Sequence, residues 1–159
     1  MDKKEQFVQL IEEALKARES SYSPYSHFKV GAALLTKAGV IYRGCNIENA
    51  SYGATNCAER TAFFKAVSEG ERDFAAIAIV GGKEAEEPIR SAATSQILDE
   101  KSFPIEEISD YAYPCGICRQ VMLEFCKSDF IVIVARSAGD YKEFTLDEIA
   151  PFGFSSENL

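Results

Sequence analysis

A short, fully apolar run in the middle of the chain limits the folds that this sequence can adopt. Residues Phe74 to Val80 carry no polar side chain, and the run is far shorter than the roughly 20 residues that a membrane span needs. Such a run is typical of a strand that is buried on both faces of a sheet. The sequence therefore predicts a layered domain, with this strand at the centre of a sheet covered on both sides.

Patterns before this run supply a helix and a hairpin. The first twenty residues place apolar side chains at helical spacing, at Phe7, Leu10, Ile11, Ala14 and Leu15. The segments Val30 to Leu35 and Val40 to Tyr42 flank a short turn that contains Gly39. This arrangement predicts two strands joined as an antiparallel hairpin.

Two further helices are expected, and each begins with a cysteine. The first runs from Cys57 to about Gly70, with Asn56 as its N-cap and the glycine as its stop signal. The second runs from Cys115 to Cys126, directly after Pro114, a residue suited to a helix start. Cysteines are thus expected at two helix N-termini.

The C-terminal part completes the sheet. Strands are expected at Asp129 to Arg136 and Tyr141 to Thr145, joined by a link too short for a parallel crossover. Thr145-Leu-Asp-Glu148 is a capping box for a last helix. The polar stretch at about 82–113 predicts a surface excursion with one short helix. The fold class is therefore α/β: a single domain over 1–159, built as a three-layer α/β/α sandwich with a mixed five-stranded sheet.

Charge and cysteine usage limit the partners and the compartment. The formal net charge of −8 disfavours a nucleic acid polymer, because no basic cluster offsets the repulsion from phosphates. The N-terminus is too charged for a secretory signal, and the chain holds five cysteines, an odd number. We expect a cytoplasmic protein with reduced thiols, no membrane segment and a small-molecule substrate.

Two cysteine motifs indicate a catalytic metal site. Cys57-Ala-Glu59 and Pro114-Cys115-Gly-Ile-Cys118 place thiols on the first turns of the expected helices, where the helix dipole favours the thiolate that binds zinc. Three protein ligands leave tetrahedral zinc one open position for water, as in catalytic sites. Cys-x-Glu followed later by Pro-Cys-x-x-Cys is the cysteine form of the zinc nucleobase deaminase signature.

Further segments extend the likeness over nearly the whole chain outside 82–113. They are Ser26-His-Phe-Lys-Val-Gly-Ala-Ala-Leu-Leu35, Gly44-Cys-Asn-Ile-Glu-Asn-Ala50, Cys57-Ala-Glu-Arg-Thr-Ala62, Lys65-Ala-Val-Ser-Glu-Gly70, Pro114-Cys-Gly-Ile-Cys-Arg-Gln-Val121 and Phe154-Ser-Ser-Glu-Asn-Leu159. Together they resemble the small homotetrameric, zinc-dependent cytidine deaminases of the cytidine/deoxycytidylate deaminase superfamily. The 82–113 stretch is longer than that family usually carries, so its role lies outside the resemblance.

The resemblance implies a metal centre and a reaction. Cys57, Cys115 and Cys118 would hold one Zn²⁺ per chain, and Glu59 would be the proton shuttle. The reaction implied is hydrolytic deamination of free cytidine and deoxycytidine by a zinc-activated water, in pyrimidine salvage. Three thiolates and Zn²⁺ sum to a net charge of −1, and Arg60 matches the family's arginine that offsets it by hydrogen bonding to the ligands.

The resemblance also implies contacts to the nucleoside, from Phe28, Asn46, Glu48, Tyr52, Ala58 and Phe154. Asn46 and Glu48 match the pair that binds the ribose 3′-hydroxyl, which cytidine and deoxycytidine share. Phe28 matches an aromatic beside the pyrimidine, Tyr52 lines the nucleoside site, and the backbone of Ala58 contacts the base. Phe154 matches an aromatic that enters a neighbouring subunit's site, so a homotetramer with shared active sites is implied.

Alternative interpretations of the site residues remain open from the sequence. A structural zinc site would need Cys45 or Cys126 as a fourth ligand, although both fit better as buried small apolar residues. Pro-Cys-x-x-Cys alone also fits a redox pair. Asn46 and Glu48 could serve a turn, and Phe28 and Phe154 could be core aromatics.

The alternatives for other residues and for the function are fewer. His27, the only histidine, is expected in an exposed loop without a role, and Arg119 either supports the site or lies on the surface. The alternative functions are deamination of another aminopyrimidine, such as a nucleoside antibiotic or a base in nucleic acid, and a noncatalytic zinc-binding module. Only the last would make Glu59 dispensable.

Overall fold

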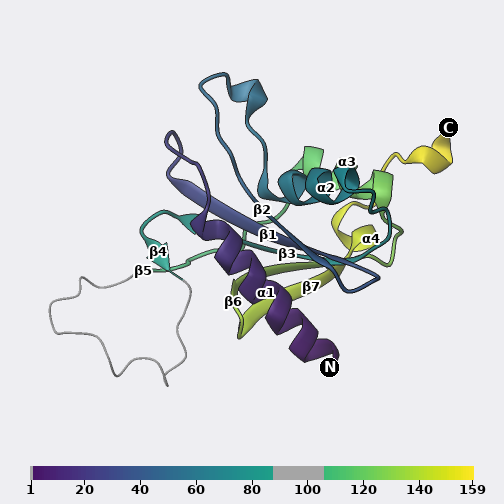
Figure 1. Cartoon of the computed structure of the whole chain (residues 1–159), viewed down its shortest axis with the longest axis horizontal. Helices are drawn as coiled ribbons and strands as arrows, with labels where there is room; N and C mark the ends of the chain where they lie inside the picture. The colour runs from purple at the N-terminus through teal and green to yellow at the C-terminus, as the bar shows by residue number, and fades with distance from the viewer. Residues whose placement is uncertain (1, 88–105) are drawn as a thin grey trace, which may run out of the picture.

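A mixed five-stranded sheet with helices on both faces forms the body of the protein, as the computed structural model shows for residues 2–87 and 106–159 (Figure 1). The strand order is β2-β1-β3-β6-β7, with β3 and β6 parallel and the other neighbours antiparallel. The strands are β1 Phe28–Thr36, β2 Ile41–Cys45, β3 Phe74–Lys83, β6 Ile131–Ser137 and β7 Asp140–Thr145. The apolar run predicted as the central strand is therefore the middle strand of the sheet.

Helices complete the three predicted layers. Helix α1 (Lys3–Glu19) crosses one face of the sheet, and α2 (Ala58–Ser68), α3 (Gly116–Phe125) and α4 (Leu146–Ile149) lie on the other (Figure 1). Alternate residues of β3 enter the two cores: Ile77 and Ile79 face α2, while Ala78 and Val80 face α1. The period of two along a strand thus explains why a run without polar residues is required here. No helix in the described part of the chain is long and apolar enough to cross a membrane.

A glycine in β2 allows the cysteine-bearing helix α2 to lie close to the sheet. A methyl group at Gly44 would lie 2.3 Å from the carbonyl oxygen of Ala58 and 2.4 Å from the amide nitrogen of Ala62. Backbone atoms cannot move aside as a flexible side chain can, so only glycine fits. Gly44 therefore helps to place the first turn of α2.

The starts of α2 and α3 differ slightly from the prediction. Cys57 and Cys115 are the N-caps, in extended conformation, so the helices begin one residue later. The prediction of Asn56 as N-cap is wrong, because its backbone exchanges two hydrogen bonds of 2.9 Å with Ile47. That bridge keeps Asn56 in the loop ahead of the helix.

Other local predictions are confirmed. Thr145 and Glu148 form the capping box of α4, and Gly70 follows α2 with a φ of 99°. The strand β3 runs past Val80 to Lys83, because β1 pairs with it as far as Phe28.

The excursion at 82–113 is described only in part. It contributes β4 (Glu86–Glu87) and β5 (Glu106–Glu107), which pair in parallel beside the main sheet. The short helix was predicted in this stretch without bounds; residues 82–87 and 106–113 hold no helix, and 88–105 lie outside the described residues. Two 3₁₀ turns, η1 (Tyr52–Ala54) and η3 (Ser156–Asn158), lie in the loop before α2 and near the C-terminus.

Replacing Gly44 with alanine is expected to destabilise the protein by about 3 kcal/mol, because the new methyl group forces α2 away from β2. Urea unfolding followed by circular dichroism measures the change. Gly139→Ala is the control, since a methyl group there meets no atom within 4 Å. Equal stability of the two variants would contradict the close packing of α2.

Candidate metal centre and adjoining cavity

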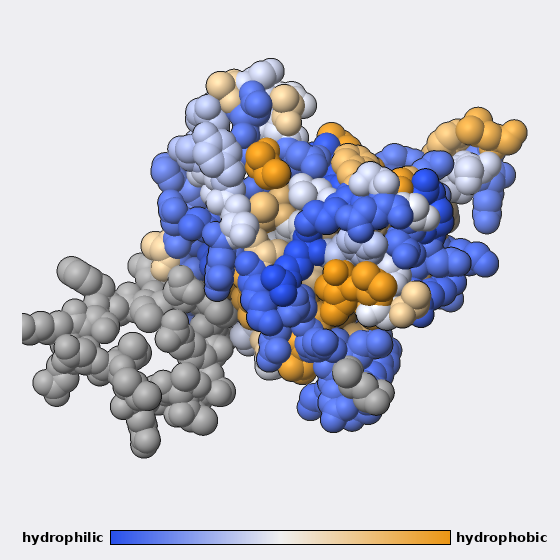
Figure 2. All heavy atoms as spheres, viewed as in Figure 1, coloured by the Kyte–Doolittle hydropathy of each residue, from blue (hydrophilic) through white to orange (hydrophobic). Residues whose placement is uncertain are grey.

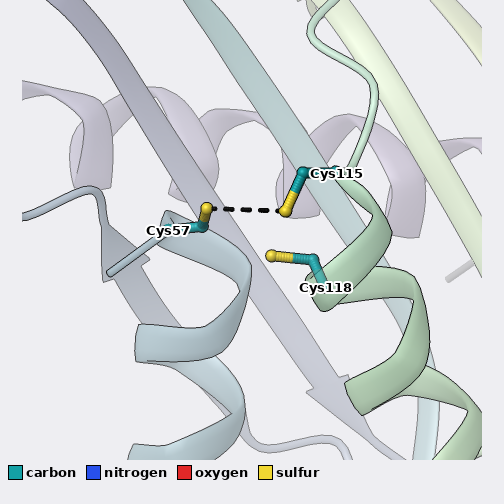
Figure 3. Close-up of side chains that lie close together, drawn as sticks. All are labelled: Cys57, Cys115 and Cys118. Carbon is teal, nitrogen blue, oxygen red and sulfur yellow. Dashed lines mark hydrogen bonds between the residues drawn. The ribbon is translucent and has the colours of Figure 1, made fainter. Parts of the chain in front are cut away.

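Three cysteine side chains converge where α2 and α3 begin. Cys57 and Cys115 are the N-caps of these helices, and Cys118 lies in the first turn of α3. The three sulfur atoms lie within 4.8 Å of one another, with 3.8 Å between Cys57 Sγ and Cys115 Sγ. Figure 3 shows the three sulfurs pointing into one shared space. The two motifs, 58 residues apart in sequence, thus form one cluster.

The spacing of the sulfurs suits zinc. A Zn–S bond of about 2.3 Å and tetrahedral angles place two sulfur ligands about 3.8 Å apart. The Cys57–Cys115 separation matches this value, and the third sulfur needs only a small adjustment. The donor set and its geometry therefore fit a zinc ion with one position left open.

The other two cysteines lie outside this cluster. Cys45 Sγ donates a hydrogen bond to the carbonyl of Ser20 at 3.3 Å, and Cys126, just past the end of α3, packs against the core. Both are half-buried, not fully buried as predicted. Burial nevertheless raises the pKa of Cys126 to about 12. In the described residues, no cysteine is placed to be the fourth ligand of a closed structural site.

The cluster favours a thiolate at Cys57. The hydrogen bond from the Cys118 thiol lowers the pKa of Cys57 to about 5, and Arg60 acts in the same direction against the effect of burial. The pKa of Cys118 is raised because it donates its proton to Cys57 and is itself buried. The positive end of the α2 dipole further favours negative charge at the N-cap. The cluster therefore carries negative charge before any cation is considered.

Arg60 lies against the cluster, and Arg119 does not. Arg60 Nη2 donates to Cys57 Sγ at 3.3 Å, as the resemblance implies. Arg119 Nε donates to the carbonyl of Pro114 at 2.9 Å, and its Nη1 donates to the carbonyl of Ile149 at 2.6 Å. Arg119 therefore ties the start of α3 to the end of α4 and supports the site only indirectly.

Glu59 is the buried acid of the site. It lies in the first turn of α2, two residues after Cys57, and only 5% of its surface is exposed. Burial raises the pKa of Glu59 to about 7, and the negative charge on Cys57 adds to the shift. A carboxyl group with such a pKa can both take and return a proton near neutral pH.

A cavity of about 300 Å³ opens beside the cluster. Its lining comes from β1, the loop before α2, the start of α2, β3 and the segment before α3: Phe28, Val30, Asn46, Glu48, Thr55, Asn56, Cys57, Ala58, Glu59, Ile79, Ala112, Tyr113 and Cys115. Seven of these residues were predicted for the site from the sequence. The structure thus brings two of the predicted metal ligands, the predicted acid and four of the predicted substrate contacts to one space.

Asn46 and Glu48 line the cavity and also hold a turn. The Asn46 amide accepts from the backbone N–H of Val30 and donates to the carbonyl of Phe28, both at 2.8 Å. Glu48 accepts from the backbone N–H of Tyr25 at 2.9 Å. The sequence left open whether these two residues serve a turn. They do hold the turn, and they also line the cavity.

Two predicted substrate residues lie outside the cavity. Tyr52 is 77% exposed and lines a neighbouring cleft, with its ring centre 6.1 Å from that of Tyr25. Phe154 is 59% exposed on the C-terminal segment, where its carbonyl accepts from Gln120 Nε2 at 2.8 Å. Their roles at a nucleoside site remain predictions.

Three further residues bear on the site: His27, which was expected to have no role, and two of the six cavity-lining residues that were not predicted. His27 is exposed, as expected, with its Nδ1 3.2 Å from a carboxylate oxygen of Glu84. Ala112 and Tyr113 line the cavity but were not predicted. The sequence did hold a signal for them: they directly precede Pro114-Cys115, and residues next to a predicted metal ligand in sequence also lie near the site.

Comparisons with known proteins agree with this geometry. The family model for the cytidine and deoxycytidylate deaminase zinc-binding region matches residues 3–134, which include the three clustered cysteines and Glu59. A cytidine deaminase of Halalkalibacterium halodurans is 47% identical over 150 residues, covering 94% of this chain and 95% of that protein. A cytidine deaminase of Sporosarcina psychrophila is also 47% identical, with coverage of 94% and 92%.

A solved structure shares the fold. The cytidine deaminase from Burkholderia pseudomallei aligns with a TM-score of 0.71 and 43% identity, covering 92% of this chain and 97% of that one. The likeness therefore extends over most of the length of both chains.

Replacing Cys115 with alanine is expected to abolish stoichiometric zinc binding, because the two remaining sulfurs form an incomplete ligand set. Elemental analysis of purified protein after dialysis measures the zinc content, with one ion per chain expected for the wild type. Cys45→Ala is the control, because Cys45 lies outside the cluster and should leave zinc content unchanged. Full zinc occupancy in Cys115→Ala would contradict the assignment of this residue as a ligand.

Proposed function

This chain belongs to the cytidine and deoxycytidylate deaminase family, and we propose that it hydrolyses free cytidine and deoxycytidine to uridine and deoxyuridine with release of ammonia. The observation that carries this proposal is the meeting of a three-cysteine cluster and buried Glu59 at one cavity of about 300 Å³. That volume is in the range of small-molecule sites. A catalytic metal site with an acid beside it is the arrangement that deamination needs.

The three clustered cysteines would hold one zinc ion. When bound there, zinc would supply a water molecule of lowered pKa that could act as a nucleophile near neutral pH. Arg60 contributes by donating to Cys57 Sγ, which offsets the negative charge of the thiolates.

Glu59 would move the protons. Its carboxylate would take a proton from the water as the water oxygen adds to C4, which becomes tetrahedral, and deliver that proton to N3 of the pyrimidine. It would then take the proton of the new C4 hydroxyl and pass it to the amino group, which leaves as ammonia while the C4 carbonyl forms. A carboxylate suits this task because it can gain and lose a proton, whereas arginine stays charged. Burial of Glu59 in α2 keeps bulk water from competing for these transfers.

The other cavity residues support a nucleoside substrate. Phe28 is 39% exposed at the cavity and offers a ring surface to the pyrimidine. Asn46 and Glu48 present an amide and a carboxylate to the same cavity, where they would bind the ribose 3′-hydroxyl. Since cytidine and deoxycytidine both carry this hydroxyl, we expect both to be substrates. The net charge of −8 disfavours a polymeric substrate.

We further propose that four copies assemble and share their active sites. Large apolar side chains are exposed at Phe152, Phe154 and Leu159 in the C-terminal segment and at Ile117 on α3. Figure 2 shows apolar surface at the tip of the projecting C-terminal segment. Exposed apolar surface of this kind supports an interface between copies, in which Phe154 would enter a neighbour's site.

The free thiols support a reducing compartment. All five cysteines are unpaired, and the cluster binds zinc only while its thiols stay reduced. We therefore place the enzyme in the cytoplasm, where pyrimidine salvage would be its role.

Replacing Glu59 with glutamine is expected to preserve zinc content and fold while lowering kcat by about 10²- to 10⁴-fold, because the amide cannot accept a proton. Ultraviolet loss of cytidine and ammonia release measure turnover. Glu12→Gln on the exposed face of α1 is the matched control. Full activity of Glu59→Gln would remove its assigned role, and an inert wild type with bound zinc would favour another aminopyrimidine substrate or a noncatalytic zinc module.

Replacing Phe154 with alanine is expected to raise KM for cytidine by about tenfold, because an aromatic contact is lost from the neighbouring site. Mixed assemblies test the shared arrangement. Refolding an excess of Glu59→Gln chains with Phe154→Ala chains should restore a wild-type KM in the active sites, since the former supply an intact Phe154. A monomer in light scattering, or no restoration, would contradict the proposal.

A further inference from the structure

The segment that leads back from the excursion forms one wall of the cavity. We call Ile108 to Tyr113 the return segment, because it joins β5 to the Pro114-Cys115 motif. Its last two residues, Ala112 and Tyr113, line the cavity opposite the start of α2. The position of this segment therefore determines the shape of the cavity.

Two glycines of β3 form the seat of the return segment. A methyl group at Gly81 would lie 2.6 Å from Ala112 Cβ and 3.1 Å from Phe28 Cε1. A methyl group at Gly82 would lie 3.2 Å from Ile108 Cγ1. Ala112 and Phe28 thus meet over Gly81, and a small shift of the return segment changes the space between the wall and the ring of Phe28.

Tyr111 holds the return segment to the far end of the sheet. Its hydroxyl donates to a carboxylate oxygen of Asp140, and Arg136 Nε donates to the other carboxylate oxygen of Asp140 at 2.8 Å. The Arg136 guanidinium lies 5.1 Å from the centre of the Tyr111 ring, and Lys142 Nζ lies 4.3 Å from it. These partners all belong to β6, β7 and their connection, away from the cavity.

The same contacts extend to the cavity wall. Lys142 Nζ also donates to the Tyr113 hydroxyl at 3.3 Å, and the Tyr113 ring centre lies 6.0 Å from that of Phe144. Lys142 therefore contacts both tyrosines of the return segment. Tyr111 itself is not among the residues that line the cavity.

We propose that Tyr111 is a positioning residue for nucleoside binding. Held by Asp140 and by the cations of Arg136 and Lys142, it sets the distance of Ala112 and Tyr113 from Phe28. This inference rests on the proposed function, in which the cavity takes the nucleoside. Tyr111, which lies outside the cavity, would affect the affinity for the nucleoside and would take no part in the proton transfers.

Steady-state kinetics with cytidine tests this role. Tyr111→Ala is expected to raise KM about tenfold with kcat within about twofold of wild type, because a misplaced wall weakens binding without altering Glu59. Tyr111→Phe keeps the ring over both cations and should restore KM to within about twofold of wild type. Tyr141→Phe, a tyrosine of β7 that packs against α1, is the matched control and should leave both constants unchanged.

Zinc content and melting temperature of each variant separate positioning from general damage. If Tyr111→Ala fails to fold, Tyr111→Leu decides, because leucine fills space without binding the cations. A raised KM in the folded variant, with normal zinc and kcat, supports the inference. An unchanged KM, or a loss of kcat alone, overturns it. A wild type that does not convert cytidine overturns the proposed function and this inference together, whereas an active wild type with unaltered Tyr111 variants overturns only the inference.

Discussion

The site depends on how the negative charge of three sulfur atoms, all within 4.8 Å of one another, is balanced. Like charges at that separation repel strongly, so without a cation Cys57 carries the charge while Cys118 keeps its proton. Arg60 supplies one positive charge, and the two helix N-termini add only partial charges. A divalent cation bound there would relieve the repulsion and let all three thiols ionise.

The sheet determines where those helices begin. The parallel pair β3 and β6 is joined through the excursion and α3, which lies on the same face as α2. Gly44 lets α2 approach β2, and Arg119 holds the start of α3 to α4. Backbone packing therefore brings the starts of α2 and α3 close together. The short cysteine side chains are then long enough to bring their sulfur atoms into one cluster.

Local patterns predicted much of this arrangement, and non-local contacts account for what they missed. The apolar run of β3, the capping box at Thr145 and the glycine after α2 are readable because their causes lie within a few residues. Asn56 is not the N-cap because its backbone pairs with Ile47, a contact that no local rule contains. Buried Arg18 likewise donates to the carbonyls of Lys83 and Glu86, joining the end of α1 to the base of the excursion. The two cysteine motifs could be recognised because the spacing within each is local, whereas Ala112 and Tyr113 reach the cavity through tertiary packing.

The site therefore divides into two parts with different physical support. The clustered cysteines and Glu59 lie on helix starts packed against the sheet, and burial restricts the movement of Cys118 and Glu59. The wall formed by Ala112 and Tyr113 lies on an irregular segment, seated on Gly81 and held from a distance by Tyr111. Under the proposed function, changes in the first part would alter proton transfer and metal binding, whereas changes in the second would alter how the nucleoside fits. Because the wall is held by contacts outside the cavity, its position can change without any change in the residues to which the chemistry is assigned.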